Sequence, residues 1–233
     1  MLDPADTGPA CLSLCQDVQG EIFDYPEEFF KERIHNIRRP KPDDFQIKQA
    51  MEKIKKSKKP IIISGGGVFY SDAMDELGSF AIKHNIPVTQ TVMGYSTMKR
   101  DHSHFLGPIG GLGGRAANNL AKETDLAICV GTKLADFTTG SWANFENPEF
   151  KLVSINIARH DANKHLAEAV IGDAKVCLSE LSNSLGNWKS PDSWHKKSQD
   201  ELKSWNEYVD KESGPTNQET PNYAHAVGAI CLL

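Results

Sequence analysis

The chain has 233 residues, with 26 basic and 31 acidic side chains and a formal net charge of -5. This balance excludes the strongly basic surface that binding of nucleic acid requires, so we expect no nucleic acid partner. No apolar run approaches the roughly 20 residues that span a bilayer, and the first residues lack a basic-then-apolar signal pattern, so we expect no membrane association.

The cysteine pattern indicates the kind of cellular compartment in which the protein resides. The five cysteines show no Cys-x-x-Cys spacing and are Cys11, Cys15, Cys129, Cys177 and Cys231. An odd number without paired spacing predicts neither a disulfide framework nor a zinc site. Free thiols fit a reducing compartment, so we expect a cytoplasmic protein.

The first 59 residues contain one clear element. We expect a short strand over residues 11–20 and a linker at Arg38–Pro42, where two prolines and consecutive charges oppose a packed element. From Asp43 onward, apolar residues recur at helical spacing, namely Ile47, Ala50, Met51 and Ile54. This spacing predicts an amphipathic helix whose lysine-rich end is solvated.

The most informative stretch begins at Pro60. A short β-branched run ends at Ser64, three glycines follow at Gly65–Gly67, and helical spacing runs from Ser71 to His84. This order predicts a buried parallel strand, a tight turn and a helix. Ligands usually bind beyond the strand ends of an open α/β sheet, but close packing of the helix on the strand explains the glycines equally well.

Strands and helices alternate through the middle of the chain. Four more strands are predicted at residues 85–91, 125–131, 152–157 and 169–172. Helices are predicted at residues 115–122 and 174–185, and a second glycine-rich turn, residues 106–114, precedes the first of them. This alternation predicts an α/β fold with a three-layer, doubly wound, mostly parallel sheet of Rossmann-like type.

Residues 188–209 predict a polar helix with one apolar face. That face carries Trp194, Ser198, Leu202, Trp205 and Val209. Such a stripe is typical of packing on a neighbouring surface rather than of a ligand site. Residues 212–221 are expected to form a linker, followed by another helix.

Few residues suggest chemistry. His102 and His104 lie beside Asp101, but no further ligand cluster lies near them in the sequence, so we predict no metal site. Asp161 follows the fourth predicted strand, where a carboxylate can reach a ribose; helix N-capping is the favoured alternative. We find no catalytic set and predict no catalytic residue.

The order of these motifs resembles the central domain of thiamine-diphosphate-dependent enzymes of the acetohydroxyacid synthase and pyruvate oxidase group. The resemblance rests on five stretches in register, residues 65–67, 91–94, 107–114, 130–137 and 155–161. Residues 8–21, 64–71 and 136–142 are similar to a narrower branch. Members of that branch hydrolyse a carbon-carbon bond and open the ring of a cyclic trihydroxydiketone in myo-inositol degradation.

The resemblance implies a division of the chain. Residues 1–21 would be the tail of a pyrimidine-binding domain, 22–42 a linker, 43–187 the central domain, 188–219 a connecting helix and linker, and 220–233 the start of a pyrophosphate-binding domain. It implies thiamine diphosphate and Mg2+ in a full-length, homo-oligomeric enzyme. The partners of this chain would be the missing pyrimidine- and pyrophosphate-binding domains, and the chain alone would bind no cofactor and have no turnover.

The resemblance also implies a ligand cleft. In flavin-bearing members the equivalent loops hold FAD, and in other relatives they hold an adenine nucleotide or nothing. The corresponding positions are Gly65, Gly66, Gly67, Thr91, Gly94, Gly110, Gly131, Thr132 and Asp161. Lys133 stands where flavin-bearing members have Arg and cannot offer the same planar fork. We therefore favour a scaffolding cleft; the alternatives are the FAD-binding domain of a carboligase and a stand-alone nucleotide-binding domain.

Overall fold

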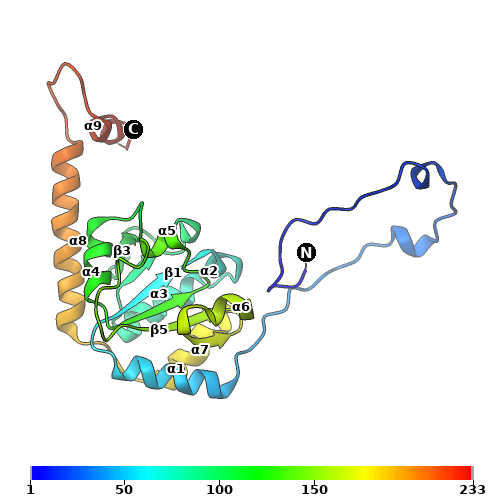
Figure 1. Ribbon diagram of the computed structural model, residues 1–233, viewed down its shortest axis with the longest axis horizontal. Coiled ribbons are helices and arrows are strands. Elements are labelled where there is room, and N and C mark those ends of the chain that lie inside the picture. Colours follow the sequence, from blue (N-terminus) through cyan, green and yellow to red (C-terminus); the bar gives the residue numbers. More distant parts are fainter. Residues whose placement is uncertain (1, 232–233) are drawn as a thin grey trace.

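The computed structural model describes residues 2–231 and contains a six-stranded parallel sheet between two layers of helices (Figure 1). The strands are β1 Pro60–Ser64, β2 Val88–Gln90, β3 Phe105–Pro108, β4 Leu126–Val130, β5 Lys151–Asn156 and β6 Glu168–Ile171. Their order, β3-β2-β1-β4-β5-β6, reverses direction between β1 and β4. An open α/β sheet usually forms its ligand crevice at such a reversal, beyond the carboxyl ends of the strands. The predicted doubly wound sheet is confirmed.

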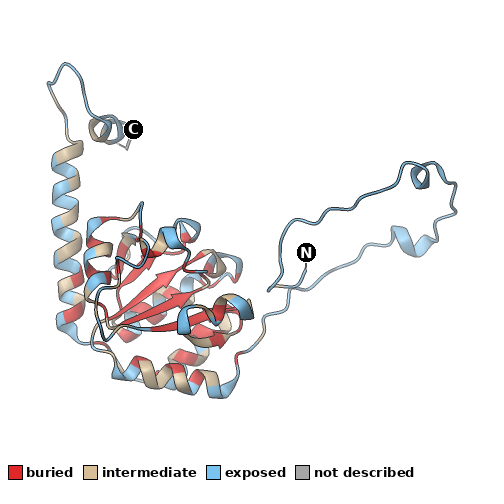
Figure 2. Ribbon diagram, in the orientation of Figure 1, coloured by how far each residue is buried: buried red, intermediate tan, exposed pale blue. Residues whose placement is uncertain are grey.

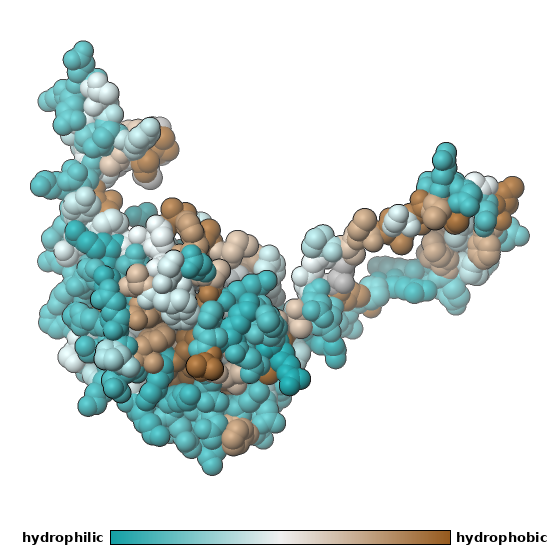
Figure 3. All heavy atoms as spheres, viewed as in Figure 1, coloured by the Kyte–Doolittle hydropathy of each residue, from teal (hydrophilic) through white to brown (hydrophobic). Residues whose placement is uncertain are grey.

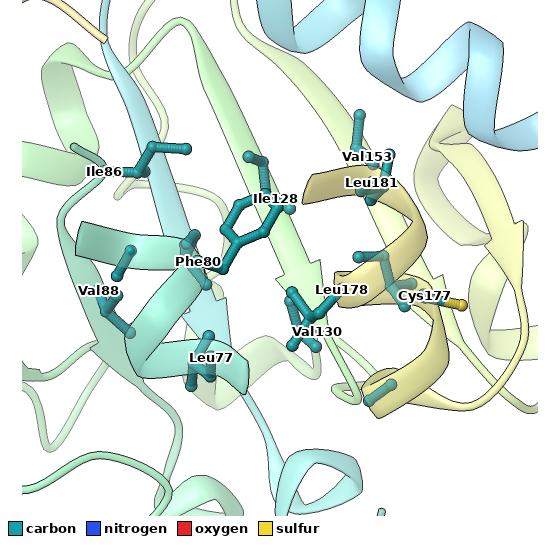
Figure 4. Packing of buried hydrophobic residues seen from close by; sticks show 14 of the residues in the cluster. Leu77, Phe80, Ile86, Val88, Ile128, Val130, Val153, Cys177, Leu178 and Leu181 are labelled. Carbon is teal, nitrogen blue, oxygen red and sulfur yellow. The ribbon is translucent and has the colours of Figure 1, made fainter. Parts of the chain in front are cut away.

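Alternate side chains of the strands enter two separate cores. In β1, Ile62 faces one core while Ile61 and Ile63 face the other, as the two-residue period of a strand requires. The first core is covered by α1 Asp44–Lys56, α3 Met74–His84 and α7 Ala174–Leu185. Figure 4 shows Phe80 of α3 and Leu178 of α7 among the side chains packed with Ile128 of β4.

The second face of the sheet is covered by α4 Arg115–Glu123 and α8 Asp192–Ser213, which lie side by side (Figure 1). Trp194 of α8 is buried, and its indole N–H donates to the carbonyl oxygen of Pro60 at 2.8 Å. Ser198 is also buried and Leu202 packs on this core. The predicted apolar stripe therefore packs on the sheet layer, and its helix continues two residues into the predicted linker.

The shorter helices lie at the ends of the strands or outside the sheet. They are α2 Gly66–Tyr70, α5 Asp136–Thr139, α6 Arg159–Ala162 and α9 Tyr223–Cys231. Within residues 2–231, no helix combines the length and the apolar character that crossing a bilayer requires. The four described cysteines are free thiols, and burial raises the pKa of Cys177 to about 12.

Within the α/β body, the sequence prediction fails most clearly after β1 and at β3. The helix expected over residues 71–84 begins only at Met74, as α3, and the short helix α2 forms before it, where a turn was expected; Asp72, with a left-handed φ of 52°, separates the two. Strand β3 was not predicted, since Gly107 and Pro108 were assigned to a turn. It is an edge strand, where a proline at the end of the ladder is tolerated, and Ile109 still donates its N–H to Gln90 at 3.0 Å.

Residues 2–42 form a largely exposed segment that projects from the α/β body (Figure 2). The strand predicted at residues 11–20 is wrong, because the structure places no neighbouring strand there and only a short 3-10 turn, Val18–Gly20, forms. Apolar side chains follow the projecting loop in Figure 3, with Phe23, Phe29 and Phe30 more than half exposed.

The predicted linker at residues 38–42 is not free of the domain. The carbonyl oxygen of Pro40 accepts from the N–H of Asp173 at 2.9 Å, and Pro42 is buried. Asp173 caps α7, accepts from the hydroxyl of Ser71 at 2.8 Å and pairs with Arg39 at 3.1 Å. This buried carboxylate therefore fastens the segment to the start of α7, although the segment itself has no regular structure.

The structure predicts that acid weakens the fold through His104. Burial, together with His195 and His102, lowers the pKa of His104 from 6.5 to about 4. Neutral His104 contacts Ser103 Oγ at 2.9 Å and Asn85 Oδ1 at 3.3 Å. The unfolded chain binds this proton more readily, so stability is complete above pH 6.5 and falls by about 2 kcal/mol as the pH drops toward 4.

Urea unfolding measured at several pH values tests this prediction. His104→Gln should flatten the decline between pH 6.5 and 4. The matched control, His35→Gln, changes an exposed histidine of the projecting segment and should leave the decline unchanged. An equal decline in His104→Gln and the unmutated chain would contradict the assignment.

Candidate functional site

A cleft of about 430 Å3 opens at the carboxyl ends of the strands, at the point where the strand order reverses. The structure brings six of the nine predicted positions together in its lining, namely Gly66, Gly67, Thr91, Gly131, Thr132 and Asp161. Gly65, Gly94 and Gly110 are not part of the lining. The sequence therefore located the cleft but included three residues that do not face it.

The glycines after β1 are explained by packing against the turn after β4. A Cβ atom on Gly67 would lie 2.6 Å from the Cα of Gly131, and one on Gly65 would lie 2.4 Å from the Gly131 oxygen. Gly131 itself has a left-handed φ of 61°. Two hydrogen bonds hold the turns together, from Gly65 N–H to Val130 at 2.8 Å and from Gly67 N–H to Gly131 at 2.9 Å. Close packing therefore accounts for these glycines without a ligand.

Gly94 and Gly110 serve the same purpose at neighbouring turns. A Cβ atom on Gly94 would lie 2.2 Å from the Ser64 oxygen, and one on Gly110 would lie 2.4 Å from the Phe137 oxygen. Thr91 orders the first of these turns, since its hydroxyl accepts from the N–H of Gly94 at 3.0 Å. These positions shape the loops around the cleft by letting backbones meet.

The cleft has two charged residues in its lining, Lys133 and Asp161. Asp161 lies inside α6, whose N-cap is Ala158, so the predicted N-cap role of Asp161 is wrong. Its carboxylate pairs with Lys164 at 2.6 Å, one turn further along the chain. Lys133 is exposed and makes no ion pair within residues 2–231. Lys164 thus compensates the charge of the Asp161 carboxylate, and Lys133 is the one cation of the cleft lining without an ion pair among the described residues.

Several lining residues were missed by the sequence prediction. Asn156, 8% exposed at the end of β5, donates from Nδ2 to the Thr132 oxygen at 3.2 Å and accepts from the N–H of Ala158 at 3.0 Å. A polar residue at the carboxyl end of a buried strand was a usable signal for it. Pro4 and Thr7 also line the cleft. Nothing in their local pattern predicts this, because the contact depends on the path of the whole projecting segment.

The histidines at residues 102 and 104 lie away from the cleft, at the start of β3. The ring of His104 stacks on the ring of His195 in α8, with 4.0 Å between the ring centres. The centre of the His102 ring lies 5.8 Å from that of His104. Among the described residues, no group of three His, Cys, Asp or Glu side chains is arranged to hold a metal ion.

Comparison with known proteins identifies the family of this chain. Residues 47–181 match the family model described as thiamine pyrophosphate enzyme, central domain. This chain belongs to the thiamine pyrophosphate enzymes. The family resemblance found in the sequence is confirmed, and the matched residues run from α1 to α7 and include the whole parallel sheet.

Curated relatives within this family are named 3D-(3,5/4)-trihydroxycyclohexane-1,2-dione hydrolase. The protein of Clostridium perfringens (strain 13 / Type A) is 48% identical over 185 residues, 79% of this chain and 29% of the relative. That of Clostridium botulinum (strain Eklund 17B / Type B) is 44% identical over 211 residues, 91% of this chain and 33% of the relative. That of Bacillus thuringiensis (strain Al Hakam) is 45% identical over 185 residues, 79% of this chain and 29% of the relative.

The chain spans about a third of the length of these relatives. Their shared name confirms the resemblance to a hydrolase branch of the thiamine pyrophosphate enzymes. The two alternatives, an FAD-binding carboligase domain and a stand-alone nucleotide-binding domain, gain no support from these relatives.

The packing role of the glycines predicts a large effect of Gly94→Ala. The added methyl group would lie 2.2 Å from the Ser64 oxygen, so the turns after β1 and β2 must separate. We expect a loss of about 2–3 kcal/mol in the free energy of unfolding, measured by urea denaturation. Gly20→Ala is the control, since no atom lies within 4 Å of the position that its added methyl group would occupy. Equal stability of the two variants would refute the packing role.

Proposed function

We propose that this chain is the central domain of a hydrolase that opens the ring of 3D-(3,5/4)-trihydroxycyclohexane-1,2-dione in myo-inositol degradation. The whole enzyme would use thiamine diphosphate and Mg2+ and act in the cytoplasm as a homo-oligomer. The observation that carries this proposal is the 44–48% identity to relatives of that name over 79–91% of this chain.

The role of this chain within the enzyme is that of a scaffold. Thiamine diphosphate, when bound, supplies an electron sink for carbon-carbon cleavage. The described residues do not fit it, because the cleft has one carboxylate, Asp161, already paired with Lys164. A Gly-Asp-Gly sequence, which carries the magnesium ligands in this group, does not occur in the 233 residues. We derive no catalytic step from these residues and assign the cofactor contacts to pyrimidine- and pyrophosphate-binding domains.

A chimeric enzyme tests the proposed function. Residues 43–187 would replace the aligned segment of the Clostridium perfringens hydrolase, and ring opening of the cyclic diketone would be followed in the purified chimera. We expect the chimera to retain ring opening, because the replaced segment supplies architecture rather than reacting groups. The 233-residue chain alone should show none.

The chimera carrying Gly94→Ala is the control for folding and should lose both stability and turnover. A folded chimera that binds thiamine diphosphate but fails to open the ring would contradict the proposed substrate. Ring opening by the isolated 233-residue chain would contradict its role as a scaffold.

The same reasoning assigns the cleft no nucleotide. Asp161 is paired, Lys133 cannot form a bidentate fork, and the projecting segment contributes Pro4 and Thr7 to the lining. Calorimetric titration of the chain with FAD, ADP, NAD, and thiamine diphosphate plus Mg2+ should give no binding heat. Tight binding of a dinucleotide would overturn this assignment and favour a carboligase.

A further inference from the structure

The segments that follow strands β1 to β4 carry a group of exposed apolar side chains, which we call the apolar rim. They come from α2, from the turn after β2, from the loop after β3 and from α5. Each is between 54% and 77% exposed, and they are Tyr70, Val92, Met93, Tyr95, Leu112 and Phe137. In Figure 3, brown hydrophobic atoms lie along the upper edge of the α/β body, where Figure 1 places α2 and α5.

The residues of the apolar rim belong to one surface around the cleft. Four of the six are part of the cleft lining, namely Tyr70, Val92, Met93 and Phe137. Tyr95 directly follows the turn that carries Val92 and Met93. Leu112 lies next to Gly111, and a Cβ atom on Gly111 would be 3.6 Å from the Phe137 ring. The rim therefore joins segments from four strand ends into one apolar surface.

The helices that cover the two faces of the sheet differ from this surface. They expose large apolar side chains singly, for example Phe45 of α1, which is 66% exposed, and Ile82 of α3, which is 55% exposed. Single exposed apolar residues are normal on a protein surface, whereas a group of them beside a concave site is typical of an interface. The apolar rim therefore indicates a surface that another folded unit covers.

The projecting segment indicates which unit lies on this side of the sheet. Its residues Pro4, Ala5 and Thr7 line the same cleft as the rim. The sequence resemblance assigns residues 1–21 to the tail of a pyrimidine-binding domain, so chain assigned to that domain lies beside the rim. Among the described residues of 220–231, which the resemblance assigns to the pyrophosphate-binding domain, none belongs to the cleft lining.

We propose that the pyrimidine-binding domain of the same polypeptide packs on the apolar rim through an apolar face of its own. This inference rests on the proposed function, because it requires the longer enzyme. This chain spans about a third of the length of its relatives, so they contain the additional chain that such a domain needs. The contact gives the scaffold a specific task, since it holds that domain over the carboxyl ends of the strands and closes the cleft.

Thiol labelling tests whether the rim is covered. Tyr95→Cys is made in the 233-residue chain and in the chimeric enzyme described above, and the labelling rate is measured by mass spectrometry on the peptide with the new cysteine. We expect labelling to be slower in the chimera by about tenfold or more, because a covered thiol reacts only when the contact opens. The matched control, Ile82→Cys at an exposed site of α3, should label at one rate in both proteins. Equal rates for Tyr95→Cys in both would overturn the proposal.

Cross-linking identifies the covering unit. In the chimera, Tyr95 is replaced by the photoreactive amino acid p-benzoylphenylalanine, and the cross-linked peptides are identified by mass spectrometry. We expect peptides from the region before the exchanged segment, joined within one polypeptide, so that the product keeps the size of the monomer on a denaturing gel. Peptides from the region after the exchanged segment would identify the pyrophosphate-binding domain, and a product of double size would identify a second copy. Either result would contradict the proposed occupant.

Charged substitutions test the energy of the contact. Met93→Lys/Tyr95→Lys should leave the melting temperature of the 233-residue chain nearly unchanged, because both side chains are exposed there. The same variant should lower the melting temperature of the chimera, because unpaired ammonium groups are then buried at the contact. The matched control, Phe45→Lys/Ile82→Lys, makes the same change on α1 and α3 and should affect neither protein. An unaltered melting temperature of the rim variant in the chimera would count against the contact.

None of these measurements uses turnover, so this inference and the proposed function can fail separately. A covered rim in a folded chimera without ring opening would refute the proposed substrate alone. Ring opening by a chimera with an uncovered rim would refute this inference alone. Where the chimera does not fold, a cysteine at the position aligned with Tyr95 in the intact Clostridium perfringens hydrolase gives the same decision.

Discussion

The contact between two backbone turns, at Gly67 after β1 and Gly131 after β4, is the constraint on which the rest of the structure depends. Each residue occupies the space that a Cβ atom on the other would need, at 2.5–2.6 Å. The two strands are neighbours at the reversal of strand order, so this contact determines how closely the loops approach above the sheet. The glycines that mark the cleft in the sequence are thus required by the fold itself.

This constraint changes the meaning of a family motif. A glycine-rich turn at the end of a parallel strand indicates a ligand only when groups able to bind one lie beside it. At the cleft, the carboxylate of Asp161 is paired with Lys164, and Asn156 bonds to neighbouring backbone. Lys133 is the one charged lining residue without an ion pair within residues 2–231. The glycine turns therefore mark how closely the loops pack rather than a built ligand site.

Much of the fold could be predicted from local pattern. Strand β4 and helix α7 were predicted within a residue of their observed limits, because a continuous apolar run and a regular helical spacing each have one interpretation. Edge strand β3 was missed because Gly107 and Pro108 look like a turn, and an edge position tolerates both. The strand expected at residues 11–20 failed for the opposite reason, since an extended segment becomes a strand only beside a partner. The helix that carries Trp194 was predicted four residues too early, over 188–209 instead of Asp192–Ser213, but its apolar face was recognised because amphipathic spacing persists over several turns.

The sequence by itself determined the α/β class, the succession of buried strands, and the family to which the central domain belongs. Each of these depends on the order and spacing of residues close together in the chain. The tertiary structure alone decided which groups meet: Gly67 with Gly131, Arg39 with Asp173, and Trp194 with Pro60. These residues are far apart in the chain, and their contacts depend on strand order and helix docking, which no local spacing encodes.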